Sequence, residues 1–129
     1  MEQLIKTMLG QKKWAVVGAH PKPEKYGYKI YKKLLDHDYD VAAVNPVYDI
    51  IDGVKTFKSL KDIKEEITCV NVVVNPERAM EVVKDVIDLG IKNIWFQPGA
   101  FTEEVIDYAE NAGLNVVFHA CVLVELDKI

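Results

Sequence analysis

The chain of 129 residues has only two cysteines, a single arginine and no long apolar run. Cys69 and Cys121 are too few for a disulfide scaffold and are typical of a reducing compartment. No apolar segment approaches the roughly 20 residues that a helix needs to cross a bilayer. The N-terminal residues Met1–Lys6 lack the basic-then-apolar order of a signal peptide. The sequence therefore predicts a cytoplasmic protein that is not associated with a membrane.

An excess of positive charge is also missing. Sixteen lysines and arginines stand against 20 aspartates and glutamates, so the net charge is −4 at pH 7. This balance argues against a nucleic acid as partner. The histidines and cysteines lack the spacing of metal ligands, so no metal site is predicted. Half of the residues are hydrophobic, and we expect one domain over residues 1–129.

Apolar patterning and turn residues predict strands and helices in alternation. The predicted strands are Trp14–Gly18, Val41–Val44, Cys69–Val74, Asn93–Phe96 and Asn115–Phe118. The predicted helices cover Leu4–Leu9, about Tyr26 to Asp38, Pro76 to Gly90 and Thr102 to Gly113, and a short connector follows the Asp52-Gly53 turn. Thr102 and Ser59 are the expected N-caps of the last helix and of the connector. The tail His119–Ile129 is apolar enough to pack, and the pattern assigns it no type.

Alternating strands and helices require parallel strands with right-handed crossovers. A closed barrel of eight such units needs about 250 residues. The predicted fold class is therefore α/β, with a three-layer, doubly wound, five-stranded parallel sheet and helices on both faces. Ligands of such sheets bind beyond the carboxyl ends of the strands. Four strand ends carry turn or polar residues there: Gly18-Ala19-His20, Asn45-Pro46, Asn75-Pro76 and Gln97-Pro98-Gly99.

The turn after the first strand has the features of an anion site. Gly18 allows a positive φ and a close approach of ligand to backbone. The helix that begins near Tyr26 would present free N–H groups to a phosphate above the turn. His20, Lys22 and Lys25 add basic groups beside that helix. This segment therefore predicts a ligand with several phosphates.

The dinucleotide fingerprint, three glycines followed by an acid about twenty residues on, is absent. Only Gly18 and Gly27 stand in this segment, and the second strand ends in the neutral Asn45. A carboxylate at that position would repel a ribose phosphate, whereas an amide can donate a hydrogen bond to it. The residues thus favour a phosphorylated adenine cofactor over NAD, without naming coenzyme A (CoA).

Four segments closely resemble the small stand-alone CoA-binding proteins, which are similar to the CoA-binding domain of the succinyl-CoA synthetase α subunit: Gly18–Tyr26, Tyr39–Pro46, Trp95–Gly99 and His119–Glu125. The resemblance implies a Rossmann-like fold that binds CoA or an acyl-CoA, with no established reaction for the stand-alone members. The expected partner is this small-molecule ligand, and a homodimer stays possible as an assembly of the chain. The expected ligand-binding residues are Gly18, Ala19, His20, Lys22, Lys25, Tyr26, Asn45, Pro46, Val74, Asn75, Arg78, Gln97 and Gly99.

The chain departs from the family at several of these positions. The family usually has serine at His20, arginine at Lys25 and serine at Gly27, and an aromatic–arginine pair at Val74-Asn75. Arg78, the only arginine, lies one turn further on. It is either the replacement for the missing cation or a surface residue.

Other interpretations stay open. One is an NAD(P)-binding enzyme, which would need a substrate pocket that so short a domain rarely supplies. Another is a thiol or redox protein that uses Cys121, because His119 and Cys121 would share a face if they lay on a strand. Gly18 and Gly27 also fit pure packing roles, and Lys22 and Lys25 fit ordinary solvated lysines.

Overall fold

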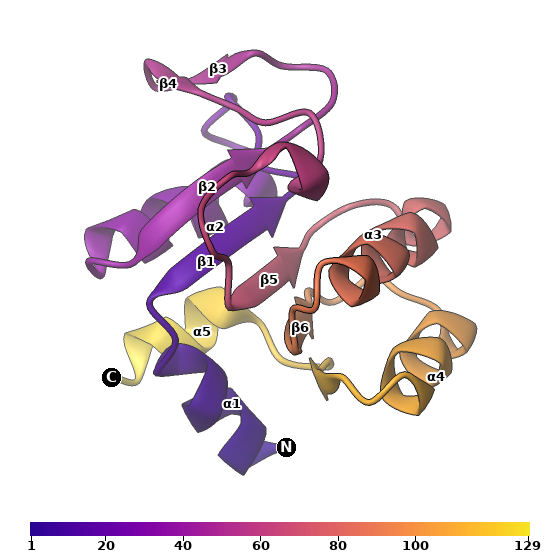
Figure 1. Ribbon diagram of the computed structural model, residues 1–129. Coiled ribbons are helices and arrows are strands. Elements are labelled where there is room, and N and C mark those ends of the chain that lie inside the picture. The colour runs from indigo at the N-terminus through magenta and orange to yellow at the C-terminus, as the bar shows by residue number, and fades with distance from the viewer.

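Five parallel strands form the centre of the computed structural model, which describes residues 1–129 (Figure 1). They are β1 (Lys13–Val17), β2 (Asp40–Val44), β5 (Cys69–Val72), β6 (Asn93–Phe96) and β7 (Asn115–Val117). Their order across the sheet is β2-β1-β5-β6-β7. The chain therefore winds in opposite directions from β1 and from β5. The boundary between these two strands is the topological switch point, where open α/β sheets bind ligands.

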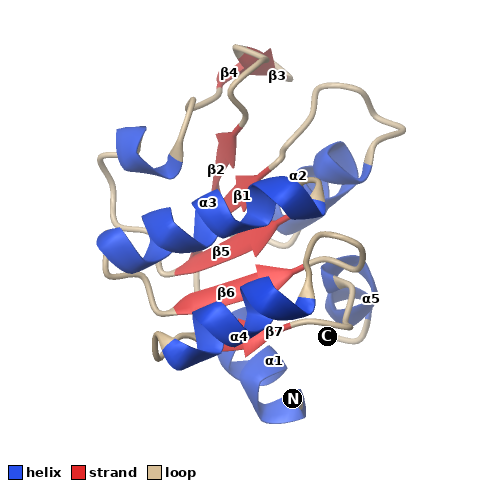
Figure 2. Cartoon of the chain, turned by 90° about the vertical axis from the view of Figure 1, so that its right-hand side faces the viewer, coloured by secondary structure: helices blue, strands red, loops and turns tan.

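Helices cover both faces of this sheet. Figure 2 shows α3 (Pro76–Asp88) and α4 (Glu103–Asn111) in front of it, and α1 (Glu2–Leu9), α2 (Tyr26–Asp36) and α5 (Val122–Asp127) behind it. The predicted fold class, a three-layer doubly wound sheet, is confirmed. None of the helices has the length and apolar character needed to span a bilayer.

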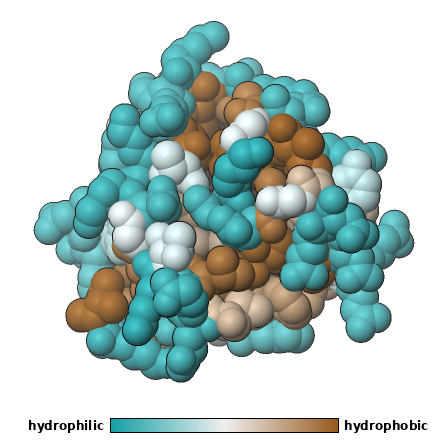
Figure 3. Space-filling view, turned by 60° about the horizontal axis from the view of Figure 1, so that its bottom comes forward, coloured by the Kyte–Doolittle hydropathy of each residue, from teal (hydrophilic) through white to brown (hydrophobic).

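The two faces of the sheet carry separate hydrophobic cores, because successive side chains of a strand point to opposite sides. Ala15 and Val17 pack into the core under α3 and α4, whereas Trp14 and Val16 pack into the core under α1, α2 and α5. Both faces are buried, which explains why the strands are apolar without alternation. Along α1 the cover is thinner: Leu4, Ile5 and Leu9 are only partly buried, and apolar atoms reach the surface on that side (Figure 3).

The element boundaries differ from the prediction at a few ends. The third predicted strand stops at Val72 instead of Val74, because β1 beside it already ends at Val17. The Thr102 cap is confirmed, since its hydroxyl accepts the Val105 N–H at 3.2 Å. Ser59 does precede a short 3₁₀ helix (η1, Leu60–Asp62), but its side chain makes no capping bond. The unassigned tail forms α5.

A small hairpin that the prediction missed stands beyond β2, at the top of Figure 1. It pairs β3 (Ile50–Ile51) with β4 (Val54–Lys55) in antiparallel register. Asp52 and Gly53 both have positive φ, 50° and 80°, as a two-residue hairpin turn requires. Phe57 then returns to the sheet, where its N–H donates to the Ala43 carbonyl at 2.9 Å. We call residues 46–58 the flap.

Candidate functional site

A groove with a cavity volume of about 380 Å³ lies over the switch point, at the carboxyl ends of four strands. Three larger hollows lie elsewhere: one on the flap, one between α2 and α5, and one between the η1 segment and the end of α3. The strand-end groove is the candidate site because parallel sheets place their ligands there. It is lined by Gly18, His20, Asn45, Val73, Val74, Asn75, Arg78, Pro98, Gly99 and Ala100.

The turn that follows β1 is shaped by backbone packing. Gly18 has a φ of +103°, and a Cβ placed on it would lie 2.2 Å from the Val73 carbonyl oxygen. A Cβ on Gly27 would lie 2.1 Å from the Gly18 carbonyl oxygen. Strand ends and the first turn of α2 therefore touch at positions where only glycine fits. Close protein packing, one of the two interpretations left open by the sequence, is sufficient to require both glycines.

Several backbone donors around this turn have no partner inside the protein. The N–H groups of Ala19, His20, Tyr26 and Gly27 make no hydrogen bond. Lys25, the N-cap of α2, adds no side-chain capping bond. Unpaired N–H groups at the start of a helix, together with its partial positive charge, are the chemistry that binds phosphate.

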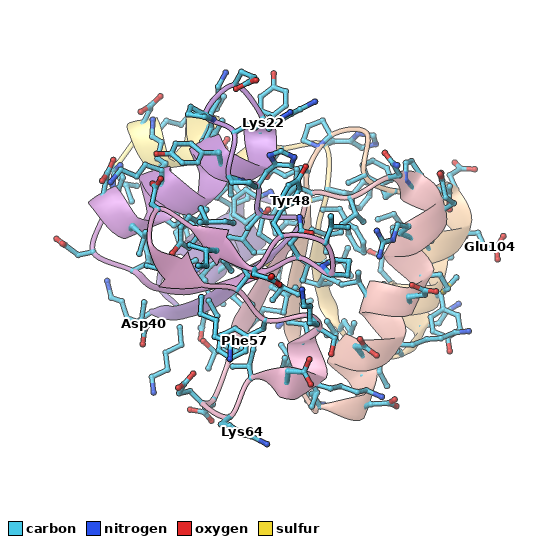
Figure 4. All side chains as sticks on the ribbon, turned by 90° about the horizontal axis from the view of Figure 1, so that it is seen from above. Lys22, Asp40, Tyr48, Phe57, Lys64 and Glu104 are labelled. Atoms are coloured by element: carbon cyan, nitrogen blue, oxygen red, sulfur yellow. The ribbon has the colours of Figure 1, made fainter.

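His20 is held in a defined orientation within this turn. Its Nδ1 accepts the N–H of Lys22 at 3.1 Å, which leaves Nε2 to carry the proton of the neutral ring. The ring stands edge-on to Tyr48 of the flap, with 4.7 Å between ring centroids. Tyr48 and Lys22 lie at the same end of the molecule in the view from above (Figure 4). Burial and the neighbouring Lys25 and Lys22 lower the pKa of His20 below its usual 6.5.

Asn45 connects the turn to the flap. The residue is 9% exposed, and its Nδ2 donates to the Ala19 carbonyl at 2.8 Å. Its Oδ1 accepts from the N–H groups of Val47, at 2.8 Å, and Tyr48, at 3.3 Å. The amide that we expected to donate to a ribose phosphate thus has an observed role in holding loops together, since backbone groups lie within its reach on both sides.

The opposite side of the groove carries uncommitted groups. Asn75 is the N-cap of α3, but its side chain makes no capping bond and is exposed. Arg78 is also exposed and takes part in no salt bridge or side-chain hydrogen bond. It lines the groove together with Val74. Gly99 has a φ of +85° with no atom within 4 Å of its would-be Cβ. This wall is therefore open to a ligand.

The remaining expected residues lie outside the lining of the groove. Lys22, Lys25, Tyr26 and Pro46 are exposed, and the two lysines form no salt bridge. The side chain of Ala19 is fully buried.

Gln97 is also outside the groove, because the residue is only 4% exposed and its amide bonds within the protein. Its Oε1 accepts from Asn71 Nδ2 at 3.2 Å and from Val122 N at 3.1 Å. Its Nε2 donates to Cys121 Sγ at 3.2 Å. Gln97 thus joins the end of β6 to the start of α5.

The proposed pairing of His119 with Cys121 is not found on a strand. β7 ends at Val117, His119 follows with a φ of +62°, and Cys121 is the N-cap of α5. The His119 ring packs on Phe101, with 5.2 Å between centroids. The strand on which the thiol interpretation depended is therefore absent at these residues. Cys69 is fully buried, and this burial raises the pKa of its thiol far above the usual value.

Comparison with known proteins gives a consistent family. The family described as "CoA binding domain" matches residues 12–127. The uncharacterized protein YneT of Bacillus subtilis is 31% identical over 113 residues, which cover 88% of this chain and 84% of that protein. A solved structure, a hypothetical protein from Pyrococcus horikoshii, is 38% identical with a TM-score of 0.92, over 98% of this chain and 89% of that chain.

Larger enzymes contain a similar segment. The alpha subunit of ADP-forming acetate–CoA ligase II of Pyrococcus furiosus is 27% identical over 119 residues. The match covers 84% of this chain and only 26% of that subunit. This chain is therefore similar to about a quarter of the ligase subunit.

Proposed function

We propose, on the premise that this chain belongs to the CoA-binding domain family, that it binds CoA or an acyl-CoA in the groove at the ends of β1, β2, β5 and β6. The observation that carries the proposal is the position of the groove at the switch point of the sheet, with unpaired N–H groups on one wall and unpaired cations around it. The residues proposed to contact the ligand are the groove residues Gly18, His20, Val74, Asn75, Arg78 and Gly99, together with Lys22 and Lys25 near His20.

The charges suit a ligand with phosphates at two places. The unpaired N–H groups of Tyr26 and Gly27 begin the helix that packs against Gly18. Lys25 and Lys22 are close enough to His20 to lower its pKa, and Arg78 lines the opposite wall. CoA carries a diphosphate and a separate ribose phosphate, so one molecule offers charge to both walls. Hydrogen bonds from cations to phosphate are stronger than neutral ones. Binding should therefore weaken when either phosphate group is removed.

The proposed role is binding without a reaction of the domain's own. The Cys121 sulfur is within hydrogen-bond distance of Gln97, and His119 packs against aromatic rings. Neither residue lines the groove. A domain of this kind would hold or deliver CoA, and we place it in the cytoplasm, where the two free thiols stay reduced.

Titration calorimetry with CoA, dephospho-CoA, NADP and NAD at one pH and salt concentration tests the proposal. We expect CoA to bind most tightly and dephospho-CoA at least about tenfold more weakly, because a charge-assisted hydrogen bond contributes about 1.5 kcal/mol or more. A hundredfold excess of CoA over its Kd stabilises the fold by about 2.7 kcal/mol, a rise in Tm on the order of 10 °C. Binding of NAD without binding of CoA would refute the proposal, and equal binding of dephospho-CoA would remove its ribose-phosphate part.

A further inference from the structure

We propose that His20 is a positioning residue whose neutral ring sets the turn over the groove, so that binding of CoA weakens when this ring takes up a proton. The inference rests on the proposed function and adds a dependence on pH to the same site. Its basis is a series of hydrogen bonds that begins at the ring and ends at Lys25, the N-cap of α2.

The first bond of the series runs from the Lys22 N–H to His20 Nδ1, over 3.1 Å. A side-chain acceptor that binds the N–H two residues ahead closes a tight turn, a role that Asn, Asp and Ser side chains also have. The Lys22 carbonyl then accepts the Lys25 N–H at 3.0 Å, and Lys25 is the N-cap of α2. The ring of His20 therefore determines where α2 presents the N–H groups of Tyr26 and Gly27.

Contacts with the flap make it unfavourable for the ring to turn away. The ring packs edge-on against Tyr48 at 4.7 Å, and the Tyr48 N–H is held by Asn45 Oδ1 at 3.3 Å. A protonated ring carries a hydrogen on Nδ1, and that hydrogen would point at the Lys22 N–H. Two donors then face each other, so protonation breaks the turn instead of tightening it.

The charged groups around His20 act in both directions. Burial is the first cause of the lowered pKa of His20; Lys25 and Lys22 of the same loop also lower this pKa, and Glu24 raises it. Tyr48 faces it from the flap, and Arg78 of α3 lines the same groove. Bound phosphates would favour a charged ring. If charge alone mattered, CoA would bind more tightly in acid, whereas the turn predicts the reverse.

The experiment compares wild type with His20→Asn and His20→Ala by titration calorimetry with CoA from pH 8 to pH 5. Asn supplies the same acceptor and does not titrate, so the affinity of His20→Asn at each pH is the reference in which the turn keeps its hydrogen bond. Ala lacks the acceptor, and we expect about fivefold weaker binding at both pH values, as for one lost hydrogen bond. The phosphate of CoA, which titrates near pH 6, affects all variants alike.

The readout is the ratio of the wild-type affinity to the His20→Asn affinity, which should fall about fivefold or more from pH 8 to a pH below the midpoint of the His20 ring titration measured by NMR. A constant ratio, or one that rises toward pH 5, would overturn the proposal. The ligand-free protein offers a separate test, because the NMR shift of the Lys22 amide should follow the titration of the His20 ring. An amide that does not respond overturns the inference, whereas failure of every variant to bind CoA at pH 8 overturns the proposed function instead.

Discussion

The two walls of the groove use similar sequence features in different ways. The β1–β2 wall contains Gly18 and Asn45, and the β5–β6 wall contains Asn75 and Gly99. Each wall thus has a glycine with positive φ and an asparagine followed by proline. On the first wall the glycine touches backbone and the amide is hydrogen-bonded to loops. On the second wall the glycine faces open space and the amide is unbonded.

This difference separates residues that build the site from residues that are available to a ligand. A polar side chain at the end of a parallel strand points toward the ligand crevice, whether or not the loops beside it need a hydrogen bond. The loops of the first wall are long and include the flap, so they use Asn45. The second wall leads directly into α3, and Asn75 stays exposed. Matched substitutions on the two walls test the distinction.

The largest contrast is expected between Gly18→Ala and Gly99→Ala. Both glycines have positive φ, which costs alanine roughly 1–2 kcal/mol. At Gly18 the new methyl would also meet the Val73 carbonyl at 2.2 Å, which adds overpacking strain. Urea unfolding should show a loss of about 3 kcal/mol or more for Gly18→Ala and about 1 kcal/mol for Gly99→Ala. Equal losses would contradict the difference in packing between the walls.

A second contrast compares Asn45→Ala with Asn75→Ala. The first removes three hydrogen bonds and leaves the Ala19 carbonyl and two flap N–H groups without partners. We expect the free energy of unfolding to fall by about 2–3 kcal/mol. Asn75→Ala should change it by less than about 0.5 kcal/mol, because no bond is lost. If Asn75→Ala proved as costly, the assignment of Asn75 as a side chain without a structural role would be wrong.

A third contrast concerns affinity for CoA. Arg78→Ala should weaken binding about tenfold, because it removes the cation of the second wall. Lys84→Ala is the matched control, since this residue is exposed on the same helix and lies outside the groove. Calorimetry should find wild-type affinity for the control, and thermal melts should find both variants as stable as wild type. Unchanged affinity of Arg78→Ala would mean that this arginine does not contact the ligand.

The smallest effect is expected where the flap meets α2. The Tyr28 hydroxyl donates to Asp52 Oδ2 at 2.7 Å, and this bond is the first cause of the raised pKa of Tyr28. A raised pKa means that the link is fully present below the ordinary tyrosine pKa near 10 and is lost as the pH rises through the higher value. The difference in tyrosinate absorbance between wild type and Tyr28→Phe should therefore have its midpoint above pH 10. In an Asp52→Asn background that midpoint should move down; if it stays, the bond is not the cause.

Much of this architecture was predictable from the residues. The apolar runs identified all five strands of the sheet, and Gly90 and Gly113 marked the ends of α3 and α4. The turn at Asp52-Gly53 was predicted, but its strands have two residues each and are too short for a periodic pattern. The α5 tail was missed because six residues do not establish a helical repeat. The strand ends of the groove were predicted because parallel strands all finish at one edge of the sheet.

The amino-acid sequence by itself determined which segments become strands and helices and which residues stand at the ligand edge, because these follow from local pattern and from the geometry of parallel sheets. Only the tertiary structure decided what those residues do there. Asn45 bonds to loops and Asn75 is exposed to solvent, and both outcomes depend on segments far away in the chain. The same holds for Gln97, whose buried amide is taken by Asn71 and Val122. Hydrogen bonds of this kind are made between distant residues, and no local pattern encodes them.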